Sequence, residues 1–171
     1  MNFNIFFPRI CVYYSNFDLQ KVVIHCSDMN ITIRETKGIK KKDILSLYEA
    51  NQWSSAQKPD ALYNALMNSD TLVSAWDGNT LVGIGNAITD GHLVVYYPHL
   101  LVLPEYQGHG VGKKLMEVFQ ERYAGFHQQI LVADGRAIDF YERCGFKPAG
   151  ETRAMWIYNG QEHEAIKTGQ D

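Results

Sequence analysis

The chain has 171 residues, of which 46% are hydrophobic and 20% are charged, and its formal net charge is −3. A chain of this length can bury roughly 70% of its unfolded surface, so we expect one soluble globular domain with a single hydrophobic core. Nucleic-acid binding is not favoured, because the balance is slightly acidic and the lysine run at residues 40–42 is short. The three scattered cysteines Cys11, Cys26 and Cys144 favour neither a disulfide framework nor a zinc site, and they are typical of a reducing compartment.

Neither a membrane segment nor a signal peptide is predicted. The longest apolar stretch, residues 93–104, is interrupted by Pro98 and His99 and falls short of the roughly 20 residues needed to cross a bilayer. The N-terminal sequence M-N-F-N-I-F-F-P-R-I lacks the basic start and the small-residue cleavage site of a signal peptide. We therefore expect a cytoplasmic protein with no membrane partner.

The chain divides by composition into three parts. Residues 1–28 are aromatic and without a clear period, and we treat them as an N-terminal extension of uncertain role. Met29 is one candidate start of the native product, and the alternative that residues 1–28 belong to the fold stays open. Residues 29–160 form the predicted domain, and residues 161–171 form a polar tail.

Hydrophobic periodicity predicts a sheet flanked by helices. Apolar residues at helical spacing predict helices over residues 40–51, 59–67, 111–123 and 136–144. Apolar runs predict strands that begin after Met29, flank the turn Gly78-Asn79, and cover residues 93–103, 129–133 and 154–158. The strands of the hairpin are antiparallel, so the predicted fold is a mixed α/β sheet.

The strongest local signal is a glycine-rich turn between a buried strand and a helix, in the sequence L-L-V-L-P-E-Y-Q-G-H-G-V-G-K-K-L of residues 100–115. Backbone N–H groups in the first turn of such a helix lack partners within it and lie at the positive end of its dipole. Gly108, Gly110 and Gly112 remove side chains that would hold a phosphate away, and they tolerate the positive φ angles of an anion-binding nest. The turn therefore predicts a phosphate site, with a plain tight turn as the alternative.

Two common nucleotide motifs do not fit this turn. A dinucleotide-binding G-x-G-x-x-G that begins at Gly108 would need glycine where Lys113 stands. A Walker loop would need glycine in place of Gln107, and serine or threonine in place of Lys114. The turn is therefore neither of these nucleotide sites.

A different pattern, Q-x-x-G-x-G, does fit, with Gln107, Gly110 and Gly112 after the strand that ends in V-L-P. Here the chain resembles the GNAT superfamily of N-acetyltransferases, and the segment D-F-Y-E-R-C-G-F at residues 139–146 is similar to that family's second signature. The resemblance covers residues 29–158. It implies an α/β (α+β) fold with a mixed, mostly antiparallel central sheet that is flanked by helices and splayed at the strand before the glycine loop.

The same resemblance implies acetyl-CoA as the acetyl donor and no metal. The strand before the loop would present backbone groups to the pantetheine arm, and the loop would hold the pyrophosphate. The residues expected to bind acetyl-CoA are Leu100, Leu101, Val102, Gln107, Gly108, His109, Gly110, Val111, Gly112, Lys113 and Asp134. Asp134 replaces an asparagine that the family often has, so capping of the following helix is its alternative role. Pro98, which lacks an N–H, is a candidate cause of a local break in the sheet.

Acetyl transfer also requires a proton donor for the leaving thiolate and a base for the amine. Tyr141 occupies the family's general-acid position in F-Y-E, and a phenol with a pKa of about 10 is protonated at neutral pH. Its alternative role is to pack the short helix into the core. His99 has a pKa suited to a base, while ordered water as the base and a plain wall position for His99 are the alternatives. The backbone N–H of Leu101 or Val102 would stabilise the oxyanion.

The resemblance predicts an N-acetyltransferase, an acyltransferase of groups other than aminoacyl groups, that modifies a primary amine of a small molecule or a peptide. Trp53 is a candidate aromatic wall for this acceptor, or a packing residue between two helices. The rival hypotheses are a non-catalytic acyl-CoA-binding module and a regulatory module that binds a partner through residues 1–28. A homodimer stays open as the oligomeric state.

Overall fold

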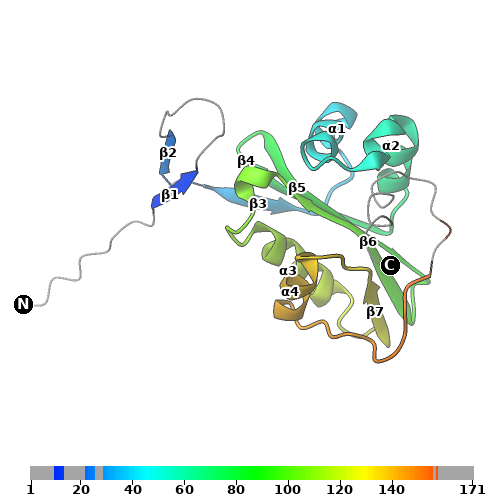
Figure 1. Cartoon of the computed structure of the whole chain (residues 1–171). Helices are drawn as coiled ribbons and strands as arrows, with labels where there is room; N and C mark the ends of the chain where they lie inside the picture. Colours follow the sequence, from blue (N-terminus) through cyan, green and yellow to red (C-terminus); the bar gives the residue numbers. More distant parts are fainter. Residues whose placement is uncertain (1–9, 14–21, 26–28, 156, 158–171) are drawn as a thin grey trace, which may run out of the picture. The chain divides into compact units, whose positions relative to one another are not determined.

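The computed structural model describes residues 10–13, 22–25, 29–155 and 157, and it separates into two compact units, residues 1–30 and 31–171. In the first unit, β1 (Ile10–Tyr13) pairs antiparallel with β2 (Val22–His25). The second unit contains the larger sheet and all the helices that the structure describes (Figure 1).

The sheet of the second unit has five strands in the order β3-β4-β5-β6-β7. Its strands are β3 (Ile31–Arg34), β4 (Thr71–Asp77), β5 (Thr80–Thr89), β6 (Val94–Val102) and β7 (Gln128–Leu131). Neighbouring strands are antiparallel except β6 and β7, which are parallel. The prediction of a mixed, mostly antiparallel sheet is confirmed.

Helices cover both faces of this sheet (Figure 1). The described helices are α1 (Lys41–Ala50), the 3-10 helix η1 (Ser54–Gln57), α2 (Pro59–Met67), the 3-10 helix η2 (Pro104–Tyr106), α3 (Val111–Arg122) and α4 (Ala137–Arg143). α1 and α2 pack on one face, where Tyr48 and Leu66 are fully buried, and α3 packs on the other face, where Phe119 is fully buried. Among these helices, none has both the length and the apolar character that a bilayer crossing requires.

One predicted strand, over residues 154–158, is not formed by its described residues. Ala154, Met155 and Ile157 belong to no strand, and Met155 is 95% exposed, while residues 156 and 158 lie outside the described part of the chain. An apolar run becomes a strand where a sheet edge is at hand to pair its backbone, and the described part of this run has no such partner. The other predicted helices and strands are confirmed, with small shifts at their ends.

β6 separates from β7 partway along its length. The two strands pair as far as Tyr97 opposite Leu131, and the next residue is Pro98, which has no N–H to donate. On its other side β6 remains paired with β5 as far as Val102 opposite Gly83, across one irregularity in the register. The last part of β6 therefore has an open edge on the side of β7, and the predicted splay at the strand before the glycine loop is confirmed.

The alternation of an antiparallel pair decides which residues face this open edge. Leu103 donates its N–H to Val82 O at 2.8 Å, so Leu101 and His99, at every second position before it, direct their N–H and C=O groups toward β5. The residues between them, Leu100 and Val102, direct their backbone groups toward the open edge.

Gly85 allows β5, β6 and α3 to pack closely, and its replacement tests this packing. A Cβ on Gly85 would lie 2.8 Å from both Leu100 Cδ1 and Phe119 Cε2. We expect Gly85→Ala to lower the free energy of unfolding by about 1–3 kcal/mol, because the buried core must shift to admit the methyl group. Urea unfolding measures this change. Gly125→Ala is the control, since a Cβ there would meet no atom within 4 Å, and a Gly85→Ala variant as stable as the wild type would contradict the packing.

Candidate active site

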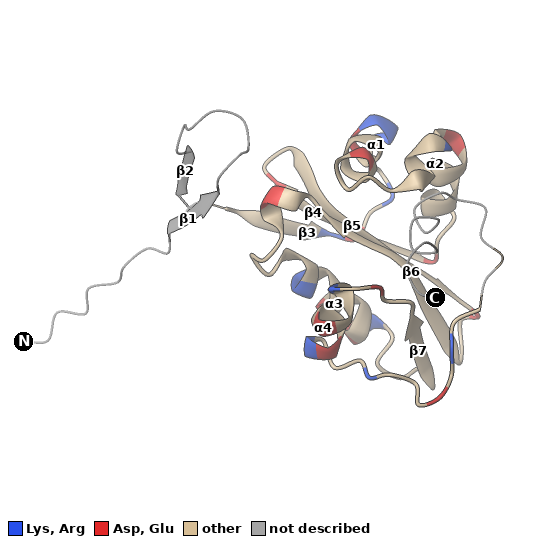
Figure 2. Cartoon of the chain, viewed as in Figure 1, with Lys and Arg blue, Asp and Glu red and all other residues tan. Residues whose placement is uncertain are grey.

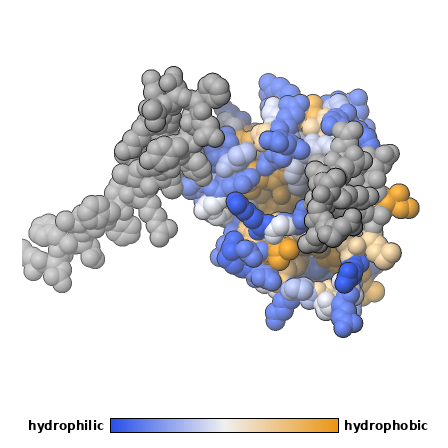
Figure 3. Space-filling model, viewed as in Figure 1, coloured by the Kyte–Doolittle hydropathy of each residue, from blue (hydrophilic) through white to orange (hydrophobic). Residues whose placement is uncertain are grey.

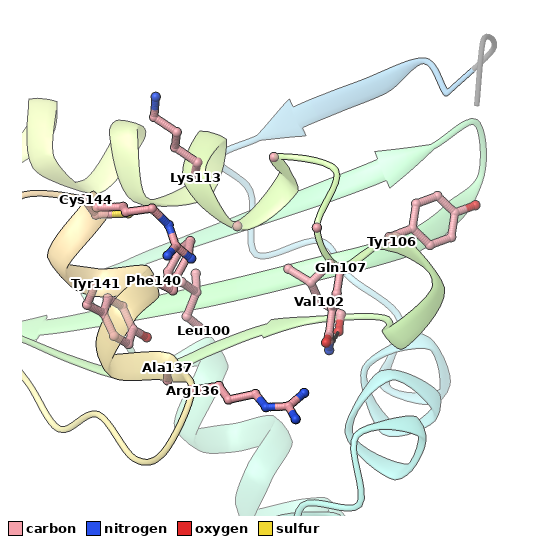
Figure 4. Close-up of a pocket in the computed structure, with 14 residues that line it drawn as sticks. Leu100, Val102, Tyr106, Gln107, Lys113, Arg136, Ala137, Phe140, Tyr141 and Cys144 are labelled. Atoms are coloured by element: carbon pink, nitrogen blue, oxygen red, sulfur yellow. Dashed lines mark hydrogen bonds between the residues drawn. The ribbon is translucent and has the colours of Figure 1, made fainter. Parts of the chain in front are cut away.

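A cavity of about 790 Å³ lies beside the open edge of β6 (Figure 4). Its walls come from β6, from the glycine loop between η2 and α3, and from α4. The residues selected from the sequence that line it are Leu100, Val102, Gln107, Gly108, Gly110, Gly112, Lys113 and Tyr141. In the space-filling view, apolar surface is visible in the hollow between the two helix layers, bordered by hydrophilic side chains (Figure 3). Segments far apart in the sequence thus enclose one site.

The glycine loop has the backbone geometry of an anion-binding nest. Gly108 and Gly110 have φ angles of 78° and 82°, and Gly110 occupies the N-cap position of α3. Lys114 donates its N–H to Gly110 O at 3.1 Å, so the N–H groups of residues 111–113 have no acceptor within the helix. A Cβ on Gly108 or Gly110 would meet no atom within 4 Å, which means that backbone conformation, and not crowding, requires glycine there. The loop can therefore hold a phosphate group.

Gly112 does not contribute to the anion-binding nest the positive φ angle that is expected from the sequence. It lies in the first turn of α3 and is absent from the described glycines with positive φ, so the expectation of a left-handed conformation there is wrong. A Cβ at this position would lie 3.3 Å from Phe140 Cζ of α4. Gly112 therefore lets α4 approach the start of α3, and this contact forms one wall of the cavity.

The open edge of β6 meets the side chain of Gln107. Gln107 Nε2 donates to Val102 O at 3.0 Å and to Asn51 Oδ1, at the C-terminal end of α1, at 3.3 Å. Leu101, between the two residues that face the edge, is 3% exposed and packs into the core beneath α1 and α2. Leu100 and Val102 are therefore the residues whose backbone groups an extended ligand could pair with, as an added strand would.

Basic side chains line the cavity on more than one side (Figure 4). Figure 2 shows basic residues on α3 and α4, and those that line the cavity are Lys113, Arg136 and Arg143. Lys113 Nζ lies 3.7 Å from Glu117 Oε1 in an exposed pair, which contributes little to stability. Arg143 is not among the residues expected from the sequence, although its spacing of seven residues from Arg136 places both on one side of a helix. These cations suit a ligand with several phosphates.

Tyr141 extends from α4 at the cavity wall (Figure 4). Its ring packs edge-on against Phe140 and Phe146, with centroid distances of 5.0 and 5.9 Å. Burial, with smaller contributions from Cys144 and Tyr96, raises the pKa of the Tyr141 phenol to about 12. The phenol is therefore protonated at neutral pH, and it has no hydrogen bond to any residue that the structure describes.

His99 lies on the face of β6 opposite to the cavity. Its Nδ1 is 2.7 Å from the Tyr48 hydroxyl of α1, and its ring lies edge-on to Trp53 at a centroid distance of 5.2 Å. Burial lowers the pKa of His99 to about 4, so the imidazole is neutral at physiological pH. The structure does not bring His99 together with Tyr141 at the cavity, because neighbouring residues of a strand point to opposite faces.

The remaining residues expected to bind acetyl-CoA do not line the cavity. Val111 is 2% exposed in the core beneath α3, and His109 is half-buried between the two positive-φ glycines of the loop. Asp134 is exposed before α4, and its carbonyl accepts the Ala137 N–H at 3.0 Å. Arg136 holds the N-cap position of α4, two residues after Asp134, and a capping role for Asp134 stays a prediction.

Comparisons with known proteins agree on one family. Residues 68–148 match the model of the acetyltransferase (GNAT) domain. The chain is 31% identical to a GNAT-family acetyltransferase from Streptococcus pneumoniae TIGR4, with a TM-score of 0.67 over 75% of this chain and 98% of that one. It is 23% identical to the N-acetyltransferase ycf52 of Gracilaria tenuistipitata var. liui, over 89% of this chain and 95% of the relative. The aminoglycoside N-acetyltransferase AAC(6')-Iy, solved in complex with CoA, shares the fold, with a TM-score of 0.59 at 16% identity over 81% of this chain and 99% of that one.

Gly110→Ala tests the geometry of the glycine loop. An alanine with a φ of 82° is strained by about 1–2 kcal/mol, so we expect the affinity for inorganic pyrophosphate to fall about tenfold as the loop leaves this conformation. Calorimetry of pyrophosphate binding measures the change. Gly78→Ala introduces a similar strain in the β4–β5 turn, where φ is 57°, and should bind like the wild type. Equal affinities of all three proteins would show that the loop does not depend on its left-handed residues.

Proposed function

Since this chain belongs to the GNAT family of acetyltransferases, we propose that it transfers an acetyl group from acetyl-CoA to a primary amine of a small molecule or a peptide. The observation that carries this proposal is the open edge of β6 beside the glycine loop, within one cavity. A phosphate site next to unpaired strand groups suits a ligand that joins a diphosphate to an extended chain with amide groups.

The residues of the cavity fit acetyl-CoA, which supplies an activated thioester when bound. The N–H groups of residues 111–113, with Arg136 and Arg143, would hold its phosphates. Leu100 offers its backbone N–H and C=O groups, and Val102 its C=O group, to the amides of its pantetheine arm. The left-handed Gly108 and Gly110 support this fit, because they give the loop the shape of a phosphate cradle.

Tyr141 donates a proton to the sulfur of the leaving thiolate. Its phenol is protonated at neutral pH, lines the cavity and is not committed to another described residue, so it is available as a donor. The backbone N–H of Val102 stabilises the oxyanion, since the strand alternation turns it to the open edge and turns that of Leu101 toward β5.

Ordered water, and not His99, takes the proton from the amine. An amine must lose a proton to attack a thioester carbonyl and complete the transfer. A histidine whose pKa is about 4 is a weak base, and His99 lies on the other face of β6 from the cavity. Water at the open mouth of the site can pass the proton to solvent instead.

Two measurements on the full chain test this function together. We expect CoA to release or absorb heat on binding in calorimetry, and at least one member of a panel of primary amines to cause release of the CoA thiol from acetyl-CoA. No binding of CoA to the folded protein would contradict the assignment of the cavity. Tight binding without turnover on any amine would instead support a non-catalytic acyl-CoA-binding module.

Tyr141→Phe tests the proton donor. We expect kcat to fall by about 100-fold or more while the affinity for CoA stays near that of the wild type, because the phenol acts only as the thiolate leaves. In the wild type, kcat should show no loss from ionisation of Tyr141 near pH 10, since its pKa is about 12. The control is Tyr63→Phe in α2, whose hydroxyl bonds no described residue. An unchanged kcat in Tyr141→Phe would remove this residue from the mechanism.

A further inference from the structure

A group of aromatic side chains holds His99 on the face of β6 that lies away from the cavity. The His99 Nδ1 and the Tyr48 hydroxyl are 2.7 Å apart, and the rings of Tyr48 and Trp53 both lie edge-on to the imidazole. Tyr48 belongs to α1, and Trp53 immediately precedes η1. The imidazole is therefore fixed on two sides by α1 and the segment that follows it.

Burial decides the direction of the hydrogen bond between Tyr48 and His99. Tyr48 is 0% exposed, and its hydroxyl has no second hydrogen-bond partner among the described residues. If His99 Nδ1 carried the proton and donated it, the phenolic hydrogen would be buried without an acceptor there, which folded proteins avoid. Tyr48 therefore donates, and Nδ1 of His99 accepts.

The neutral His99 ring consequently carries its one N–H at Nε2. The ring is neutral because burial lowers its pKa, and the groups packed against it are uncharged: Tyr48 from α1, Trp53 before η1, and Asn86 opposite it on β5, whose amide donates to Ser69. With the lone pair of Nδ1 engaged and Nε2 protonated, His99 can donate a hydrogen bond but has no free site to accept a proton.

The position of His99 on β6 places its Nε2–H group on the side where we expect the acceptor amine. It lies two residues beyond Tyr97, where β6 leaves β7, and next to Leu100, which lines the cavity. With CoA in the cavity on the side of α3 and α4, the face of β6 toward α1 and α2 is left for the amine. His99 belongs to that face, so its N–H is placed on the side from which the amine arrives.

We propose that Tyr48 fixes His99 as an Nε2–H donor, and that this donor binds a carbonyl or hydroxyl oxygen of the acceptor amine. Tyr48 is then a positioning residue, and His99 is a residue that determines specificity. The acceptor class is an amine with an oxygen function close to the amino group, in preference to a simple alkylamine. The acceptor role rests on the proposed acetyl transfer, whereas the tautomer of His99 does not.

The tautomer can be measured on the full chain without any substrate. Long-range ¹H–¹⁵N NMR correlations of the His99 ring should show the Nε2–H form in the wild type and in the control Tyr63→Phe. In Tyr48→Phe, which removes the phenolic donor, we expect a mixture that includes the Nδ1–H form. The Nδ1–H form in the wild type, or an unchanged tautomer in Tyr48→Phe, would overturn the assignment.

Kinetics with two amine classes tests the acceptor role. For amines that carry a nearby hydroxyl or carbonyl, we expect His99→Ala to raise KM about tenfold, the effect of about 1.4 kcal/mol of lost binding. His99→Gln should restore most of this affinity, because its amide offers an N–H donor near the position of Nε2 but cannot act as a base. For simple alkylamines, both variants should resemble the wild type.

Different results contradict the donor role of His99, the preference for an oxygen function and the proposed acetyl transfer. If His99→Gln loses as much kcat as His99→Ala, His99 acts as a base, and the donor role is wrong. If both amine classes respond equally to His99→Ala, the oxygen preference is wrong. If the wild type acetylates no amine, the proposed function and the acceptor role both fail, while the NMR result still decides the tautomer.

Discussion

A strand that is paired on one side alone has a row of backbone donors and acceptors that must find partners elsewhere. In this protein, β6 is paired with β5 alone after Tyr97, because its pairing with β7 ends there and Pro98 has no N–H to continue the ladder. The glycine loop follows β6 directly, and α4 closes the opposite wall, so a phosphate cradle and the unpaired edge share one cavity. The shape of this cavity thus follows from the early end of one short parallel ladder.

The two faces of β6 carry different sets of side chains. Leu100 lines the cavity beneath α3 and α4, while His99, its neighbour in the chain, packs against Tyr48 and Trp53 of the other layer. Successive side chains of a strand alternate between faces, and the register irregularity of β6 resets this alternation, since Tyr97 and His99 lie on opposite faces although they are two residues apart. The pairing register of β6 must be kept, since a shift of one residue would exchange the two sets of side chains between the faces of the sheet.

Local signals were enough to predict most elements and part of the site. Gly78-Asn79 marks a turn and Pro59 a helix start, and the spacing of Gln107, Gly110 and Gly112 identifies the loop. Features that depend on packing were not predictable in this way. The bond between Tyr48 and His99 joins residues that are 51 positions apart, and the apolar run at residues 154–158 suggested a strand for which its described residues have no partner.

The contact of Gly112 with the ring of Phe140 makes the volumes at these two positions interdependent. A methyl group at the first would lie 3.3 Å from Cζ of the second, so the aromatic ring would have to shift by a few tenths of an ångström. A larger residue at position 112 could be accommodated together with a smaller one at position 140, since close-packed interiors accept exchanges that conserve total volume. Attempts to redesign the width of the cavity should therefore vary both positions at once, because the two side chains would share the same space.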